Sequence, residues 1–173
     1  MEEKFDDDAE YQEFLQLATA IGFVVVNWSQ IERQIDNWVM VAFNRCGGNS
    51  LSKKGKIPKM FTDKKEFLAH CFQKLPLLAP FKDEGLNLLD GALKISLTRN
   101  NFIHGTLNDI TATNGIFQFQ RLVHGEKTHQ VKNFTYALAD WPALEKAISN
   151  LLRDSRILSE KLSESFLKHK ENR

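Results

Sequence analysis

An unbroken alternation of apolar residues at steps of three and four constrains this chain more than any other feature. It begins at Phe14 and ends at Ala42. This spacing places the apolar side chains on one stripe of an α-helix, as in the seam of a helical bundle. The sequence therefore predicts one long helix over about residues 9–43, weakened only at Gly22. The stripe comprises Phe14, Leu17, Ile21, Val24, Trp28, Ile31, Ile35, Trp38 and Ala42.

The rest of the chain predicts three more helices and a β-hairpin. Breaker residues mark a loop over 44–61, and apolar periodicity resumes in three later segments. Alternation with a period of two over 116–136 predicts the hairpin, with a turn at residues 124–128. We therefore expect a mainly α fold, an antiparallel bundle of about four helices with a β-hairpin inserted before the last helix. The expected later helices begin near Thr62, between Pro80 and Asp83, and after Asp140.

Composition bounds the class of protein. At 173 residues, with 42% hydrophobic and 26% charged residues, the chain suits a single globular domain over 1–173, with residues 1–8 and 169–173 frayed. The net charge of +1 excludes a uniformly basic nucleic-acid binder, so any such role needs a local patch. The acidic N-terminus does not resemble a signal peptide, and the apolar run Phe23–Val26 is too short to span a membrane.

No cofactor or metal is expected. The sequence has no phosphate-cradling glycine loop, no paired-carboxylate motif and no His-Glu-x-x-His motif. His124 and His129 lack a Cys or carboxylate cluster that would make them a metal pair, so we expect them to be solvent-exposed at the hairpin tip. Cys46 and Cys71 form neither a metal motif nor a disulfide framework. We interpret them as reduced thiols of a cytoplasmic protein.

The end of the third helix breaks its own apolar pattern. Leu86, Leu89, Leu93 and Leu97 recur at steps of three and four, and the same stepping leads to Asn100 and His104. An amide and an imidazole are thus expected on the inward face, where polar groups need partners. Arg99 adjoins them, and Gly105 suits a helix C-terminus. A structural cap explains this arrangement, and so does a functional site.

The stretch Arg99-Asn100-x-x-x-His104 resembles the Arg-x4-His motif of the HEPN superfamily of helical domains. The resemblance covers the helical framework, about residues 9–105 and the last helix. It implies two protomers whose motifs face one composite cleft that cuts RNA, in a toxin–antitoxin or phage-defence setting. It also offers a precedent for a non-catalytic module that binds a partner, such as an antitoxin or a nucleotidyltransferase.

The residues themselves support metal-independent RNA cleavage. The nucleophile is the ribose 2′-OH, His104 can move its proton, and Arg99 can stabilise charge on the phosphate. Asn100 can hold the histidine or a phosphate oxygen, and Asn101 is a further supporting candidate. Positions five apart lie about 140° apart around a helix, so Arg99 and His104 do not share a face. Unwinding, a curled arginine or a second copy would bring them together.

Two further groups are candidates for supporting roles. Glu32 stands on a row with Ala18, Val25 and Val39 that is otherwise apolar. It either reaches water at the rim or pairs with a cation, for which Arg99 is the obvious choice. The loop over 44–61 is basic and is either a solvated loop or a phosphate-contacting patch. The RNA-binding candidates in it are Lys53, Lys54, Lys56 and Lys59.

Two functions follow as hypotheses. The first is a metal-independent endoribonuclease that works as a homodimer and leaves a 2′,3′-cyclic phosphate. The second is a non-catalytic interaction or nucleotide-binding module, in which the polar triad is a hydrogen-bonded cap. The near-neutral charge of the chain favours the second.

Overall fold

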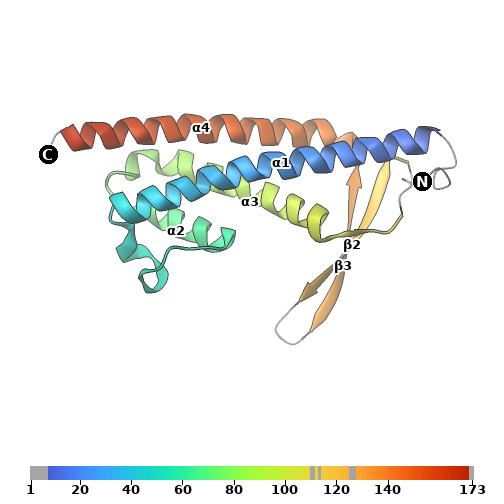
Figure 1. The fold of residues 1–173 in the computed structure, drawn as a ribbon, viewed down its shortest axis with the longest axis horizontal. Coiled ribbons are helices and arrows are strands. Elements are labelled where there is room, and N and C mark those ends of the chain that lie inside the picture. The colour runs from blue at the N-terminus through green and yellow to red at the C-terminus, as the bar shows by residue number, and fades with distance from the viewer. Residues whose placement is uncertain (1–7, 110–111, 113, 125–127, 172–173) are drawn as a thin grey trace. The chain divides into compact units, whose positions relative to one another are not determined.

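The computed structural model describes residues 8–109, 112, 114–124 and 128–171. It confirms the predicted fold class, since 75% of the described residues are helical and a small antiparallel sheet precedes the last helix. The helices of the described residues are α1 (Asp8–Arg45), α2 (Phe61–Lys74), α3 (Lys82–His104) and α4 (Trp141–Glu171) (Figure 1). The strands are β1 (Thr106–Leu107), β2 (Ile116–His124) and β3 (His129–Ala137).

The contacts divide the chain into two compact units, each described by itself below. The hairpin unit comprises Met1–Asn27 and Ile95–Ile148, and the bundle unit comprises Trp28–Lys94 and Ser149–Arg173. Helices α1, α3 and α4 each contribute residues to both units. The expectation of one domain over 1–173 stays a prediction.

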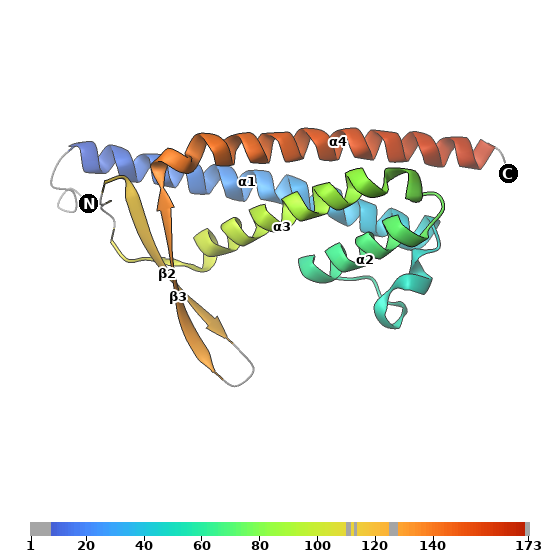
Figure 2. The same cartoon turned by 180° about the vertical axis from the view of Figure 1, so that it is seen from behind.

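The bundle unit contains α2, the loop before it and the adjoining parts of α1, α3 and α4 (Figure 2). Its core includes the buried α2 residues Phe67, Leu68, Cys71 and Phe72. Gly85 lets α3 approach α2 closely, because a Cβ there would lie 2.6 Å from the ring of Phe72. The predicted loop 44–61 is less irregular than expected, since it contains the 3-10 turns η1 (Gly48–Leu51) and η2 (Lys53–Gly55).

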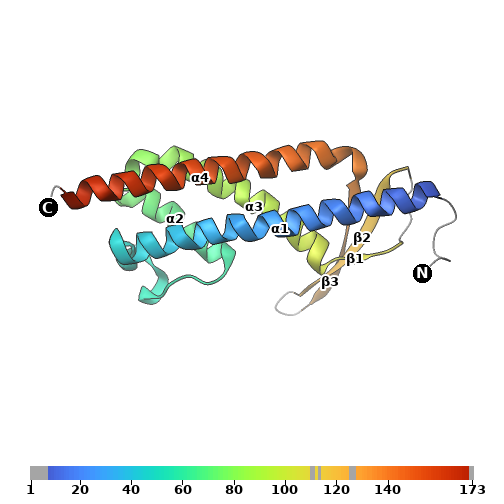
Figure 3. The same cartoon turned by 45° about the horizontal axis from the view of Figure 1, so that its top comes forward.

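The hairpin unit contains a three-stranded antiparallel sheet in the order β1-β2-β3 (Figure 3). Strands β2 and β3 confirm the predicted hairpin, whose predicted turn includes residues 125–127, outside the described residues. The short strand β1 was not predicted, because two residues carry no readable period. One face of the sheet is aromatic, and Phe102 of α3 packs on it, 5.8 Å from Phe119 and 5.2 Å from Tyr136 between ring centroids.

The predicted frayed ends differ from the structure in part. Asp8 is the first residue of α1, and residues 169–171 belong to α4. Residues 1–7 and 172–173 lie outside the described part.

Helix α1 is long and apolar enough, by length and composition only, to cross a membrane. Core helices of soluble proteins pass the same test.

Candidate functional site

The inward face of α3 follows the predicted leucine stripe only in part, since Leu89 is buried but the end of the stripe is not. The expected stripe runs through Leu86, Leu89, Leu93 and Leu97. Leu97, from which the stepping continues to Asn100 and His104, is 55% exposed, so the prediction is wrong at that end of the stripe. The buried side chains of this helix are those of Leu88, Leu89, Ala92, Ile95, Ser96 and Phe102, so beyond Leu89 the buried row runs through Ala92, Ile95 and Phe102. Both rows are apolar in sequence, and only packing against other elements decides which of them turns inward.

This correction moves the functional residues to different faces. Arg99 is four residues after Ile95 and three before Phe102, so it lies on the buried row. His104 does not replace a core leucine, because its side chain is exposed, and Asn100 is half-buried. The arginine is therefore a charged group on the core face of α3, which also carries the buried Ser96.

Arg99 carries an unsatisfied donor. Its Nε atom is buried and has no hydrogen-bond acceptor among the described residues. A terminal guanidinium nitrogen donates to the side-chain oxygen of its neighbour Asn100, at 3.0 Å. Buried donors are nearly always paired in native proteins, so the Nε–H of Arg99, for which the described residues supply no partner, is an exception. An anionic oxygen is the acceptor that a guanidinium binds most strongly.

Asn101 links the helix end to the hairpin. Its side-chain oxygen lies 3.4 Å from a terminal nitrogen of Arg121, a donor on β2. Arg121 was missed from the sequence, although the alternation Phe117, Phe119, Arg121 assigns it to the face that packs on α3. Its cross-strand neighbour on the same face is Lys132 of β3. Two cations thus extend from the aromatic face of the sheet beside the end of α3.

Gly105 fixes the spacing between α3 and the hairpin. Its N–H donates to the carbonyl of Asn101 at 2.8 Å and closes the helix. A Cβ at this position would lie 2.4 Å from that carbonyl oxygen and 2.7 Å from the ring of Phe134. Phe134 in turn stacks on Phe119, with 4.9 Å between centroids. The glycine therefore serves as the predicted helix end and also makes room for the sheet.

Glu32 has a partner that the sequence did not suggest. Its carboxylate lies 3.6 Å from the ammonium of Lys64, which is only 2.6 Å from Asp36. Lys64 is 8% exposed, so two carboxylates of α1 neutralise a nearly buried cation of α2. Glu32 belongs to the bundle unit and Arg99 to the hairpin unit, so the expected Glu32–Arg99 pair stays a prediction.

The basic loop is partly neutralised within the protein. Lys53 lies 2.8 Å from Glu66 and 3.9 Å from Asp63, and its bond to Glu66 raises the pKa of the lysine. Among the described residues, no carboxylate lies within ion-pair distance of Lys54, Lys56 or Lys59. These three remain the RNA-binding candidates of the loop, and Lys53 is the weakest of the four.

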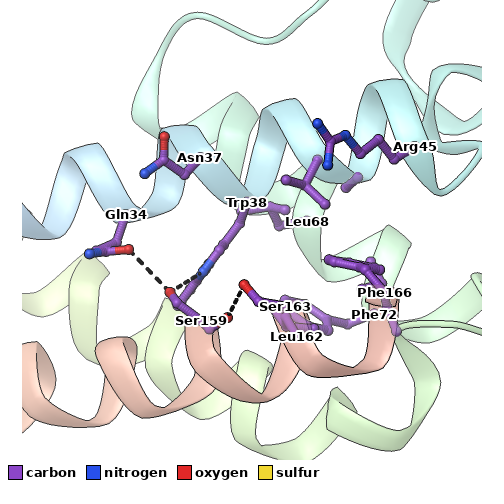
Figure 4. A pocket seen from close by; sticks show the side chains of 13 residues that line it. Gln34, Asn37, Trp38, Arg45, Leu68, Phe72, Ser159, Leu162, Ser163 and Phe166 are labelled. Atoms are coloured by element: carbon purple, nitrogen blue, oxygen red, sulfur yellow. Dashed lines mark hydrogen bonds between the residues drawn. The ribbon is translucent and has the colours of Figure 1, made fainter. Parts of the chain in front are cut away.

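The bundle unit also contains a cavity of about 430 Å³ (Figure 4). The indole of Trp38 donates to the hydroxyl of Ser159 at 2.8 Å, and that hydroxyl lies 3.1 Å from the side-chain oxygen of Gln34. The polar groups at its centre thus satisfy one another, and Leu68, Phe72 and Leu162 supply apolar wall. This pattern is typical of an imperfectly filled core rather than of a site that selects a polar ligand.

Burial holds the two cysteines as neutral thiols. Burial raises the pKa of the Cys71 thiol to about 12, and burial also raises that of Cys46. A thiol is not the nucleophilic or metal-binding form of cysteine. Within the described ranges, no three His, Cys, Asp or Glu side chains gather as a candidate metal site.

No family model matches the chain, and comparison with curated proteins and with solved structures gives no match either.

Proposed function

We propose that this protein is a metal-independent endoribonuclease that acts as a homodimer. The observation that carries the proposal is the buried, unpaired Nε–H of Arg99, one turn before the exposed imidazole of His104. A donor that binds an anionic oxygen and an imidazole that can accept or donate a proton are the two functions that phosphodiester cleavage needs. The match of these positions to the Arg-x4-His motif supports the same reaction.

In the proposed reaction, His104 accepts the proton of the ribose 2′-OH as its oxygen attacks the adjacent phosphorus. The new O2′–P bond forms while the P–O5′ bond breaks, and the leaving O5′ receives a proton from a protonated histidine. The products are a 2′,3′-cyclic phosphate and a free 5′-OH. Arg99 stabilises the charge that builds on the phosphate oxygens, and Asn100 positions the arginine through its hydrogen bond.

A second copy explains the geometry. Arg99 faces the core side of α3, whereas His104 is exposed, and the two lie about 140° apart around the helix. Beside His104, the last turns of α3 expose two large apolar side chains, Leu97 at 55% and Ile103 at 43%. Such residues suit contact with another protein surface. A partner protomer there would supply a second histidine, which serves as the acid of the reaction.

The test is RNA cleavage in the presence of a chelator. We expect the purified protein to cleave mixed RNA and His104→Ala to lose at least about a hundredfold in rate, the usual contribution of an acid–base group. His70→Ala, which removes an exposed histidine of α2, is the matched control and should cleave like the unaltered protein. Equal cleavage by His104→Ala and the unaltered protein would identify a contaminant and end the proposal.

The alternative is a non-catalytic module that binds a nucleotide or a partner protein, favoured by the net charge of +1 and by the ion pairs of Lys53. In that case the polar triad is a structural cap, and His104→Ala should cost about 1 kcal/mol or more of stability. A catalytic role predicts almost no change, since the imidazole is exposed. Thermal melting of His104→Ala beside the unaltered protein separates the two.

A further inference from the structure

A second cavity, of about 250 Å³, lies within the hairpin unit beside the candidate site. It is lined by the last turns of α3, by β3 and by the start of α4, and it opens to solvent. Phe102 and Phe134 supply aromatic wall, and Asn101, Tyr136 and Asp140 bring polar groups. We call it the base pocket. Its volume suits one heterocyclic ring system and its walls offer flat surfaces for stacking.

The hydrogen-bonding groups of the base pocket are not all satisfied within the protein. Tyr136 is 7% exposed, and its buried hydroxyl has no partner among the described residues. Burial, with a smaller contribution from the charge of Asp140, raises the pKa of Tyr136, so the hydroxyl keeps its proton and can donate. The Asp140 carboxylate can only accept. A residue that can donate, Tyr136, and one that can accept through two oxygens, Asp140, thus both line the pocket beside aromatic rings.

These groups match the Watson–Crick edge of guanine better than that of any other base. Guanine presents two adjacent N–H donors, at N1 and N2, that one carboxylate can accept together, and its O6 accepts from a hydroxyl. Adenine and cytosine each offer a ring nitrogen acceptor where the carboxylate would need a donor, and uracil offers a single N–H. Proteins that read single-stranded RNA use such edge contacts together with aromatic stacking.

The position of the pocket indicates a nucleotide rather than a free base. Asn101 lines the pocket, and its side-chain oxygen accepts a hydrogen bond from Arg121. A ring in the pocket would therefore have the guanidinium of Arg121 nearby, a group that suits phosphate. We infer that the base pocket binds a guanine of single-stranded RNA next to the phosphate that is cleaved. This inference rests on the proposed function in one respect only, namely that the phosphate next to the bound guanine is the one that is cleaved.

Binding of mononucleotides tests the inference without any cleavage. We expect full-length protein to bind 3′-GMP at least about tenfold more tightly than 3′-AMP, 3′-CMP or 3′-UMP in a calorimetric titration. Asp140→Asn, which replaces an acceptor oxygen by a donor, should abolish most of that preference. Tyr136→Phe should weaken 3′-GMP severalfold. Asp83→Asn, an exposed carboxylate of the bundle unit, is the matched control and should bind like the unaltered protein.

The failure of this inference is distinguishable from failure of the proposed function. Equal affinity for the four nucleotides, no measurable binding, or an Asp140→Asn variant that keeps the guanine preference would each overturn the base pocket. RNA cleavage that depends on His104 but ignores guanine would also overturn it while leaving the nuclease intact. Selective 3′-GMP binding by a protein that cuts no RNA would keep the pocket and reject the nuclease.

Discussion

Arg121 donates a hydrogen bond to Asn101 across 3.4 Å, so a β-strand and the last turn of a helix meet at the residue that follows the Arg99–Asn100 pair. The bond is long, and the guanidinium has four other N–H groups to offer. Arg121 is half-buried, and its strand neighbour across the sheet is Lys132. The sheet thus contributes positive charge beside the motif although the whole chain carries a net charge of only +1.

Arg121 should contribute to RNA affinity. We expect Arg121→Gln to weaken RNA binding by about tenfold and to reduce the slope of log K against log salt concentration by about one, since one phosphate contact is lost. A filter-binding or anisotropy titration at several salt concentrations measures both. Arg153→Gln, which removes an exposed arginine of α4 in the bundle unit, is the control. An unchanged slope for Arg121→Gln would exclude the phosphate contact.

Gly105 and Gly22 should respond oppositely to the same change. Gly105→Ala should cost about 1–3 kcal/mol, since its Cβ would meet the Asn101 carbonyl oxygen at 2.4 Å and the Phe134 ring at 2.7 Å. Gly22→Ala should gain about 0.5–1 kcal/mol, because Gly22 lies inside α1 with nothing within 4 Å of the added atom. Urea unfolding of both variants measures this. A neutral Gly105→Ala would refute the close approach of hairpin and helix.

Asp36 should matter more to stability than Glu32. Lys64 lies 2.6 Å from Asp36 but 3.6 Å from Glu32, and its ammonium is nearly buried. Asp36→Asn should therefore cost roughly 1 kcal/mol, and Glu32→Gln under about 0.5 kcal/mol. Denaturant unfolding gives the free energies. If Glu32→Gln instead slows RNA cleavage at unchanged stability, then Glu32 supports Arg99 as the sequence suggests.

Cys71 should make stability fall at alkaline pH. Burial raises its pKa to about 12 in the folded state, so the folded protein holds the proton more tightly than the unfolded chain, whose thiol titrates near the ordinary value of 9.0. The stabilisation is complete below pH 9 and is lost as pH rises toward 12. We expect a loss of about 1 kcal/mol between pH 8 and pH 10. Cys71→Ala should lose less over that interval, and equal slopes for both proteins would contradict the raised pKa.

The sequence predicts elements well where the signal is local. The apolar alternation from Phe14 to Ala42 is a property of one helix, and α1 indeed spans Asp8–Arg45. The breaker at Gly105 and the period-two segments likewise predicted the end of α3 and the strands β2 and β3. These features depend on residues close in sequence, so no tertiary knowledge is needed to find them.

The site was predicted less completely because its geometry depends on distant residues. Leu97 and Ile95 are both apolar, and only packing decides that Ile95 is buried and Leu97 exposed. The partners of Glu32 and of Asn101, namely Lys64 and Arg121, lie far along the chain and leave no periodic signal. Arg121 could have been found only by combining strand alternation with the aromatic face that packs on α3.

Analysis of the RNA ends formed in the presence of a chelator tests most directly whether the protein cleaves RNA with His104 and the 2′-OH of the substrate. A short RNA is incubated beside the same RNA with a 2′-deoxy nucleotide at the cleaved position. We expect a 2′,3′-cyclic phosphate and a 5′-OH from the first RNA, and no cut in the second RNA or with His104→Ala. A cut at the deoxy position, or products that end in 5′-phosphate and 3′-OH, would contradict it.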